Sequence, residues 1–338
     1  MVNQKPRVAV VIPNWNGIKV IDNCLDSLRH QTIESQVIVV DNYSTDGSSE
    51  LIARNYPEVE LINLTKNTGF TGGVNTGIKM AIDLGLDYVA LLNNDAIADK
   101  NWLNELITNA ENNLEVGIVA CKMMRMDKKH LDSTGEFYTM WGLPFPRGRN
   151  EIDDNQYDNQ NVLFGASGGA TLYRISMLKE IGLFDQDFFA YYEDVDLSFR
   201  AQLAGWKIAF EPKSIAYHLV GNSSSGLKGF TTYQTFKNLP LIIYKNVPSK
   251  LIYKIVPKFM LAYSSFFISA LLRRQAFSAF KGFIMSLVLI PKKLIQRHAI
   301  QKHRQISDEY LISIIVNSLP PGATKLSKLR KYWLKFIG

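Results

Sequence analysis

The chain has 338 residues, of which 46% are hydrophobic and 20% are charged. That length allows one large domain or two modest domains with a substantial core, and the composition excludes an intrinsically disordered chain. The two cysteines, Cys24 and Cys121, are too far apart for a metal-type spacing, which indicates a reducing compartment and a role in packing.

The net charge of +7 is distributed unevenly along the chain. From Pro240 onward the sequence contains 17 lysines and arginines but only two acids, Asp308 and Glu309, so this part carries +15 and residues 1–239 carry −8. A basic tail on an acidic body predicts an anionic partner for the tail alone. Nucleic acid and an anionic membrane surface are the two options.

The first 120 residues alternate short apolar runs with helical patterns. We expect strands at 8–12, 37–40, 59–63, 88–92 and 116–120, and helices near 18–30, 47–55, 73–84 and 101–113. This alternation predicts an α/β fold with a mostly parallel sheet, and the continuous apolar runs suit strands covered on both faces. The first apolar run is too short for a signal-peptide core, so we expect a cytoplasmic protein.

Residues 121–160 break this rhythm, and we expect loops there with a small hairpin. Regular structure is predicted to return at 165–174, with a helix at about 194–204 and a strand at 207–210. No internal repeat is evident.

Beyond residue 236 the sequence becomes basic and helical, which divides the chain into residues 1–236 and an extension at 237–338. Its longest uncharged runs, 259–272 and 282–290, are shorter than the roughly 20 residues of a membrane-spanning helix. Basic residues that flank aromatic-rich runs are typical of helices lying in a membrane interface, with Phe259, Phe266 and Phe267 among the inserted side chains. The alternative is that these helices pack on the rest of the protein.

Asp41 closes the second predicted strand, where a carboxylate can accept hydrogen bonds from a nucleobase or a ribose. Ser44 and Asp46 follow it and suit the cap of the next helix. The stretch from Asn67 to Gly77 is rich in glycine, which permits close backbone approach to a diphosphate at a helix start. Its spacing is not that of a dinucleotide fingerprint or a Walker motif, so a structural turn is the alternative.

Two further sets of residues carry acid, base or metal chemistry. Asn93, Asn94 and Asp95 follow the strand at 88–92 directly, and a hard divalent cation favours such a carboxylate together with substrate phosphates. Taken alone, this tripeptide forms a turn as often as a site. Glu193 and Asp194 open a helix, where carboxylates also serve as caps, while an ionised Asp194 could accept a proton from a bound acceptor. His218 stands apart from the other four histidines. A histidine on its own is usually structural, but imidazole is also a good ligand for manganese.

The order and spacing of these motifs resemble glycosyltransferase family 2, and more narrowly its bacterial rhamnosyltransferase-like branch. The resemblance covers about residues 7–230 and rests on Pro13-Asn-Trp-Asn16, on the segment from Asp41 to Asp46, and on Asn67-Thr-Gly-Phe, Asn93-Asn-Asp95, Glu193-Asp194 and Tyr217-His218. Asn93 stands where the family has the first aspartate of its metal motif. The resemblance implies a GT-A fold at residues 1–236, with residues 237–338 as a membrane-associating extension.

The resemblance also implies a reaction and the residues that perform it. It implies an inverting glycosyltransferase with Asp194 as the base, and with Asp95 and His218 as ligands of Mg²⁺ or Mn²⁺. It assigns the nucleotide-sugar contacts to Pro13, Asn16, Asp41, Asn67, Gly69, Asn94 and Asp95, and acceptor contacts to Glu193, Gly168 and Trp141. The donor would be dTDP-rhamnose or a UDP-sugar, and the acceptor a saccharide, lipid-linked, of cell-surface polysaccharide synthesis.

Two other classes of protein fit parts of the sequence. One is a catalytically inactive scaffold that binds a nucleotide sugar within a membrane assembly complex, which the presence of Asp95, Asp194 and His218 disfavours. The other is a nucleic-acid-binding protein, which would need stacking aromatics in a charged groove. Because the tail alternates cations with long aliphatic runs, we expect no nucleic acid and a peripheral position on the inner face of the cell membrane.

Overall fold

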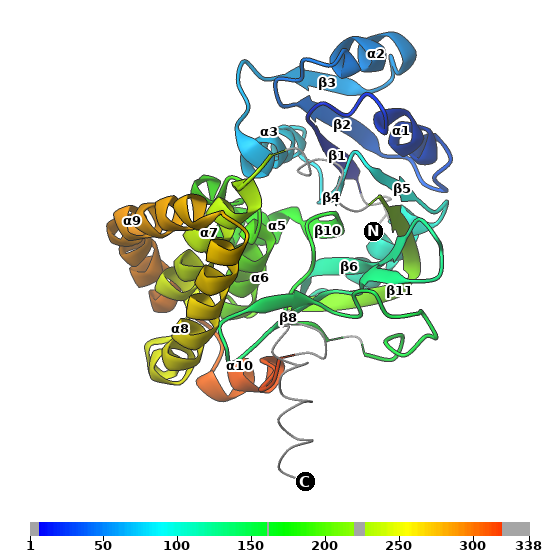
Figure 1. Cartoon of the computed structure of the whole chain (residues 1–338). Coiled ribbons are helices and arrows are strands. Elements are labelled where there is room, and N and C mark those ends of the chain that lie inside the picture. Colours follow the sequence, from blue (N-terminus) through cyan, green and yellow to red (C-terminus); the bar gives the residue numbers. More distant parts are fainter. Residues whose placement is uncertain (1–6, 161, 220–226, 320–338) are drawn as a thin grey trace.

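A computed structural model describes residues 7–160, 162–219 and 227–319 and contains a curled central sheet (Figure 1). Its strands run in the spatial order β3, β2, β1, β4, β10, β6, β11 and β5, and β7 pairs with β6. Their bounds are β1 Val8–Asn14, β2 Gln36–Asp41, β3 Glu60–Asn63, β4 Tyr88–Leu92, β5 Ala96–Ala98, β6 Val116–Arg125, β7 Leu131–Ser133, β10 Ala170–Arg174 and β11 Lys207–His218. A separate hairpin pairs β8 (Glu136–Tyr138) with β9 (Pro144–Pro146).

Helices cover both faces of this sheet and continue into the C-terminal part. They are α1 Ile21–Arg29, α2 Ser48–Asn55, α3 Gly69–Asp83, α4 Trp102–Asn112, α5 Ile175–Ile181, α6 Glu193–Leu203, α7 Phe230–Asn246, α8 Ser249–Leu272, α9 Ala276–Lys302 and α10 Asp308–Ile314, with the short 3-10 helix η1 at Gln186–Phe188. The predicted α/β architecture is confirmed, because strands β3, β2, β1 and β4 are mutually parallel. The predicted small hairpin in 121–160 is also confirmed.

Three differences from the predicted elements matter for the site. Strand β10 is antiparallel to both β4 and β6, and so it interrupts the parallel order. Strand β11 runs on to His218, beyond the predicted end at residue 210, because an irregularity between Glu211 and Ile215 absorbs a polar segment and then restores pairing with β6. Helix α3 begins at Gly69, four residues earlier than predicted, because a glycine there adopts a φ of 73°.

The apolar side chains of the strands divide between the two faces of the sheet. Val10 and Ile12 join one buried cluster, whereas Ala9 and Val11 join another, as the two-residue period of a strand requires. Helices α1 and α4 pack on the first face, and α3, α5 and α6 pack on the second. Cys24 and Cys121 are free, buried thiols, so their predicted packing role is confirmed.

The C-terminal helices form a third buried cluster with α6 and the hairpin. Helix α7 is largely buried between α6 and α9, and Figure 1 shows α7 to α9 stacked beside α5 and α6. Phe259 is 4% exposed within this cluster, so the expectation that it inserts into a membrane is wrong. By contrast, Leu272 and Phe277 are 83% and 71% exposed, so α8 and α9 also present an apolar outer face.

Helix α8 corrects another expectation about the tail. It has 24 residues, and an 18-residue window has a mean hydropathy of 1.6, which makes it long and apolar enough to cross a membrane by length and composition. The expectation that no segment is long enough rested on uncharged runs alone, whereas the helix continues past Lys250, Lys254 and Lys258. A single helix of this kind is weak evidence of a span.

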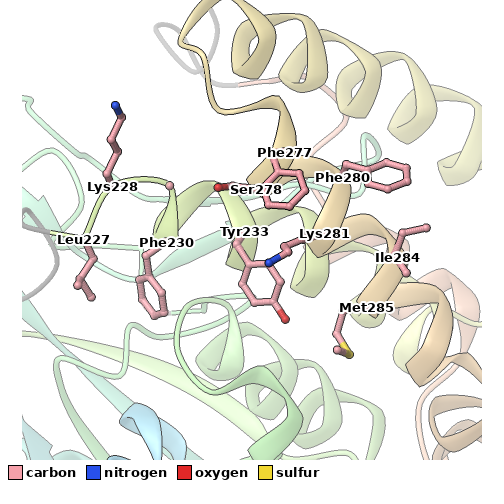
Figure 2. Close-up of a pocket in the computed structure, with 11 residues that line it drawn as sticks. Leu227, Lys228, Phe230, Tyr233, Phe277, Ser278, Phe280, Lys281, Ile284 and Met285 are labelled. Atoms are coloured by element: carbon pink, nitrogen blue, oxygen red, sulfur yellow. The ribbon is translucent and has the colours of Figure 1, made fainter.

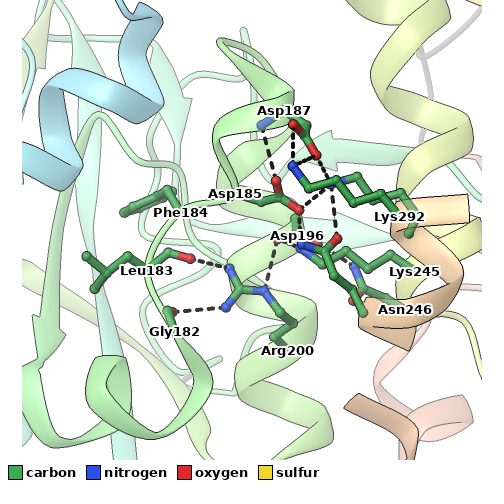
Figure 3. Close-up of polar contacts among 12 residues, drawn as sticks. Gly182, Leu183, Phe184, Asp185, Asp187, Asp196, Arg200, Lys245, Asn246 and Lys292 are labelled. Carbon is green, nitrogen blue, oxygen red and sulfur yellow. Dashed lines mark hydrogen bonds and ion pairs between the residues drawn. The ribbon is translucent and has the colours of Figure 1, made fainter. Parts of the chain in front are cut away.

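A buried ionic cluster joins the tail to the rest of the protein (Figure 3). Lys245 Nζ lies 2.7 Å from Asp185 and 2.9 Å from Asp196, and Lys293 Nζ lies 2.5 Å from Asp185 and 2.7 Å from Asp187. Burial alone would raise the pKa of the Asp185 carboxyl, but the two lysines outweigh it and lower that pKa well below its usual range. These contacts hold α7 and α9 against the segment that leads into α6.

Candidate active site

The carboxyl ends of β1, β2 and β4 meet in a buried polar network built around Asn14. Its amide nitrogen donates to Asp41 Oδ1 at 3.2 Å and to Ser48 Oγ at 2.9 Å, while its oxygen accepts from Asn94 at 2.8 Å. Because neighbouring parallel strands end at the same edge, residues 80 positions apart lie in contact. Sequence reasoning chose Pro13 and Asn16 in this segment and missed Asn14, although its place at the end of a strand was a usable signal.

A cavity of ≈ 840 Å³ opens beside this network. Its polar lining includes Asn14, Asn42, Asn67, Asn93, Asn94, Glu136, Arg149, Ser167, Glu193 and Asp194, and the predicted residues Pro13, Gly69 and Gly168 also line it. Gly69 is required by space as well as by its φ, since a Cβ there would lie 2.4 Å from the carbonyl oxygen of Phe189. The volume is in the range of a cleft that binds a small-molecule ligand.

Three predicted nucleotide contacts have other partners in this structure. Asp41 is 3% exposed and accepts from Asn14 and from the backbone N–H of Ser44, and its neighbour Asn42 lines the cavity instead. Asn16 is exposed, with its side-chain oxygen accepting from Thr45 N–H at 2.8 Å. Asn67 lines the cavity and accepts from Gly69 N–H at 2.8 Å, which fixes the turn into α3.

The start of α6 presents two carboxyl groups to the cavity, those of the buried Glu193 and the half-buried Asp194. Asp194 accepts hydrogen bonds from Gly168 N–H at 3.0 Å and from Val195 N–H at 2.8 Å. Burial raises the pKa of Asp194, and these backbone hydrogen bonds oppose the rise. Burial and the charge of Asp194 raise the pKa of Glu193 well above its usual value, so Asp194 is the more readily ionised of the two.

Glu136 and Arg149 enter the same cavity from the segment at 121–160, and sequence reasoning missed both. Glu136 belongs to β8 and is 8% exposed. Burial and then the charge of Asp194 raise its pKa well above the usual value. No local pattern marks these residues as functional, since only the folding of this segment brings Glu136, on β8, and Arg149, which follows β9, to the cavity.

Asp95 and His218 lie together, as the sequence predicts for a shared metal ion. Asp95 Oδ1 is 3.2 Å from His218 Nε2, and Asp132 Oδ2 is 2.9 Å from His218 Nδ1. Burial alone would lower the pKa of His218, but hydrogen bonds and charge from Asp132 and Asp95 raise it to about 9. Arg149 in turn pairs with Asp132 at 2.9 Å.

The Asp95–His218 pair can supply two ligands to a divalent cation. Neither residue lines the ≈ 840 Å³ cavity, whereas Asn93 and Asn94, which directly precede Asp95, do. In the ranges that the structure describes, no cluster of three or more His, Cys, Asp and Glu side chains could hold a metal ion. Two protein ligands suffice for Mg²⁺ or Mn²⁺ when substrate phosphates and waters complete the coordination. Asp132 orients the imidazole so that Nε2 faces Asp95, which is the usual support of a metal-binding histidine.

Helix α7 supports the loop that precedes Glu193 and Asp194. Phe189, Tyr191 and Tyr192 have φ values of 64°, 68° and 70°, a strained left-handed conformation for large side chains. The Asn238 amide donates to the carbonyl oxygens of Phe188, Ala190 and Tyr191 at 3.0, 2.9 and 2.8 Å. The tail therefore holds the loop in the conformation that presents the two carboxyl groups.

Trp141, predicted to contact an acceptor, lies elsewhere. It packs on the buried cluster formed with the C-terminal helices and is not among the residues that line the cavity. The other two predicted acceptor residues, Glu193 and Gly168, line the cavity next to Asp194.

Comparison with known proteins assigns this chain to a family. The family model described as Glycosyl transferase family 2 matches residues 9–182. The poly-beta-1,6-N-acetyl-D-glucosamine synthase of Staphylococcus aureus (strain COL) is 25% identical over 243 residues, which are 67% of this chain and 55% of that protein. The chain thus spans about half the length of the curated relatives it matches.

Solved structures share the fold. TarS 1–349 of S. aureus in complex with UDP-GlcNAc is 16% identical with a TM-score of 0.54, and the match covers 88% of this chain and 90% of that one. The mannosyltransferase PcManGT from Pyrobaculum calidifontis, in complex with GDP-Man and Mn²⁺, is 17% identical with a TM-score of 0.52, over 89% and 88% of the two chains. At these identities the likeness establishes the fold, which is of the GT-A type.

Proposed function

The chain belongs to glycosyl transferase family 2, and on that premise we propose that it transfers a sugar from a nucleoside-diphosphate sugar to a hydroxyl group of a saccharide. The observation that carries this proposal is the Asp194 carboxylate, which lines the ≈ 840 Å³ cavity together with Asn93, Asn94 and Gly168. A proton acceptor beside a site for a nucleotide sugar is what an inverting transfer requires.

In the proposed reaction, Asp194 accepts the proton of the acceptor hydroxyl while that oxygen attacks the anomeric carbon. The bond from this carbon to the diphosphate oxygen breaks in the same step, so the configuration inverts. Gly168 N–H holds the Asp194 carboxylate, and a protonated Glu193 can donate a hydrogen bond to the acceptor. Asp95 and His218 would hold Mg²⁺ or Mn²⁺, whose charge, when bound, stabilises the departing diphosphate.

The donor and the acceptor are the finer parts of this proposal. The resemblance to the rhamnosyltransferase-like branch supports dTDP-rhamnose, whereas the solved relative that binds UDP-GlcNAc supports a UDP-sugar. The curated relative that makes poly-beta-1,6-N-acetyl-D-glucosamine supports a saccharide acceptor in cell-surface polysaccharide synthesis. The exposed apolar face of α8 and α9 supports a lipid-linked acceptor at a membrane surface.

A ligand panel tests the proposed activity. Purified protein would be heated with dTDP-rhamnose, UDP-GlcNAc or GDP-mannose, with and without Mn²⁺, and donor hydrolysis would be followed in parallel. A true donor at 100 times its Kd should stabilise the fold by about 2.7 kcal/mol. No stabilisation by any nucleotide sugar would contradict the proposal, and binding without hydrolysis or transfer would favour the inactive scaffold.

Metal titrations test the role of Asp95 and His218. Asp95→Ala and His218→Ala should each raise the Mn²⁺ concentration needed for half-maximal activity and weaken binding of the nucleoside diphosphate. The exposed Asp83→Ala variant is the control and should leave both quantities unchanged. Full wild-type activity in excess chelator would exclude a metal at this pair.

A further inference from the structure

A second cavity of ≈ 940 Å³ lies between the start of α7 and the outer face of α9 (Figure 2). Its walls are mainly apolar and include Phe230 from α7 and Phe280, Ile284 and Met285 from α9. Two lysines, Lys228 and Lys281, also line it. We refer to these six residues as the α7–α9 groove.

The groove adjoins the active-site cavity. Leu227 and Phe230 line both cavities. The Phe230 ring also lies 6.1 Å, between centroids, from each of the rings of Phe189 and Tyr191, which belong to the loop before Asp194. A ligand in the groove can therefore extend towards the reacting carboxylate.

Close packing of the two helices gives the groove a fixed floor. A Cβ on Gly282 would lie 2.3 Å from the carbonyl oxygen of Tyr233, and a Cβ on Gly229 would lie 2.4 Å from Ser278 Oγ. Only glycine allows the two backbones to approach so closely at position 282, and Gly229 also has a φ of 80°, which favours glycine. The shape of the groove is thus fixed by the close contact between α7 and α9.

The two lysines give the apolar groove an unbalanced positive charge. Neither Lys228 nor Lys281 forms an ion pair with a carboxylate in the described part of the chain, although Lys281 Nζ lies 4.7 Å above the Phe277 ring. The N-terminus of the 17-residue helix α7 adds a positive partial charge at the same end of the groove. Apolar walls with unpaired cations complement a long hydrocarbon chain that carries a phosphate.

We infer that the α7–α9 groove binds the hydrocarbon chain and the phosphate of a lipid-linked acceptor, whose saccharide end enters the cavity at Asp194. The inference rests on the proposed function and specifies its acceptor. Exposed apolar residues of α8 and α9 outside the groove, such as Leu272 at 83% and Ile295 at 75% exposure, would lie against the bilayer from which the acceptor comes.

Binding to lipid nanodiscs tests the inference without any transfer reaction. Full-length protein would be titrated with neutral phosphatidylcholine nanodiscs that contain undecaprenyl phosphate, the same polyprenol without phosphate, or phosphatidylglycerol. We expect the tightest binding to undecaprenyl phosphate, and a loss of about tenfold in Lys281→Gln, which removes one charge-assisted contact. Phe280→Glu should weaken this binding at least as much.

Matched variants separate the groove from a general membrane surface. Val288→Glu places the same charge on α9 outside the groove, at a site that is 63% exposed, and should retain the preference for undecaprenyl phosphate. Equal binding of all three nanodiscs, or equal effects of Phe280→Glu and Val288→Glu, would overturn the inference. Donor binding is measured separately. Lipid binding in the groove without sugar transfer would therefore contradict the proposed function but not the inferred lipid site.

Discussion

The lysines of the C-terminal helices have opposite environments on the two sides of those helices. On the inner side, Lys245 and Lys293 have side chains that are 3% and 0% exposed, and they pair with aspartates before and within α6. On the outer side, Lys254 and Lys258 are exposed beside Tyr253, which is 67% exposed. The formal charge of +15 in this part of the chain therefore does not act as a whole on an external partner. Part of it neutralises aspartates of residues 1–239, and only the remainder can attract an anionic surface.

Because some lysines of the C-terminal helices are buried in ion pairs, deleting these helices is not a clean test of membrane binding. Truncation before Lys245 would remove Lys245, Asn246 and Lys293 and would leave Asp185 and Asp196 as buried charges without these partners. Such a protein would lose stability whatever the tail does at a membrane. Point variants on one side at a time avoid this difficulty.

The largest loss of activity is expected for a substitution of Asp194, which follows the loop that the inner side of the C-terminal helices supports. Asp194→Asn cannot accept the acceptor proton, so kcat should fall by about 10²–10⁴-fold while donor binding is retained. Transfer assays with the identified donor and calorimetric titration of that donor would measure both quantities. If the variant kept a third or more of wild-type turnover, Asp194 would not be the base and Glu193 would be tested next.

Two adjacent lysines of α9 allow a buried ion pair to be compared directly with an exposed one. Lys292 and Lys293 both lie 2.7 Å from Asp187 Oδ2, but their side chains are 58% and 0% exposed. Lys293→Ala should lower the free energy of unfolding by about 3–5 kcal/mol because it removes a cation that pairs with buried carboxylates. Lys292→Ala should lower it by about 1 kcal/mol or less. Urea unfolding measures both, and equal losses would mean that burial does not distinguish the two pairs.

Substitution of Asn238 tests whether the inner side of the C-terminal helices positions the loop before Asp194 as well as stabilising it. Asn238→Ala removes three hydrogen bonds to the strained loop, and displacement of Asp194 by about 1 Å can reduce kcat by about 10²-fold. Leu239→Ala, which truncates a neighbouring core residue of α7, should destabilise the protein with little change in kcat. Parallel losses of kcat in both variants would indicate a purely structural role.

The pH dependence of activity tests the raised pKa of Asp194, which follows the same loop. Because burial raises the pKa of Asp194, its ionised form is lost as the pH falls through a value above the usual aspartate pKa of about 3.9. The acidic limb of kcat/KM should therefore lie above that value, and it should persist in Glu193→Gln. A profile that stays flat down to pH of about 4 would show that this carboxyl group does not limit the reaction.

The smallest effect is expected on the outer side. Lys254→Gln and Lys258→Gln should each weaken binding to anionic vesicles by about 1 kcal/mol, or roughly fivefold, at low salt. Lys79→Gln and Lys179→Gln, at exposed positions on α3 and α5, are the matched controls. Flotation of the four variants would measure the difference, and equal flotation would place the membrane contact elsewhere.

Several features of this protein follow from the sequence because their causes are local. The apolar run at 88–92 predicts the observed strand β4 to the residue, and the acidic start of α6 is predicted to within one position. A strand-end position for Asp41 also follows, since β2 ends there. Hydrophobic periodicity and helix-start chemistry act between neighbours in the chain, so they can be read from it directly.

Contacts between distant segments were decided by the tertiary structure. The pairing of β11 with β6 and β5 carries His218 to Asp95, and the excursion at 121–160 adds Asp132, Glu136 and Arg149 to the same region. Nothing in the sequence distinguishes Lys293 from Lys292, yet one is buried and its neighbour is more than half exposed. Burial and charge pairing depend on which helix faces meet, and that is a property of the packed molecule as a whole.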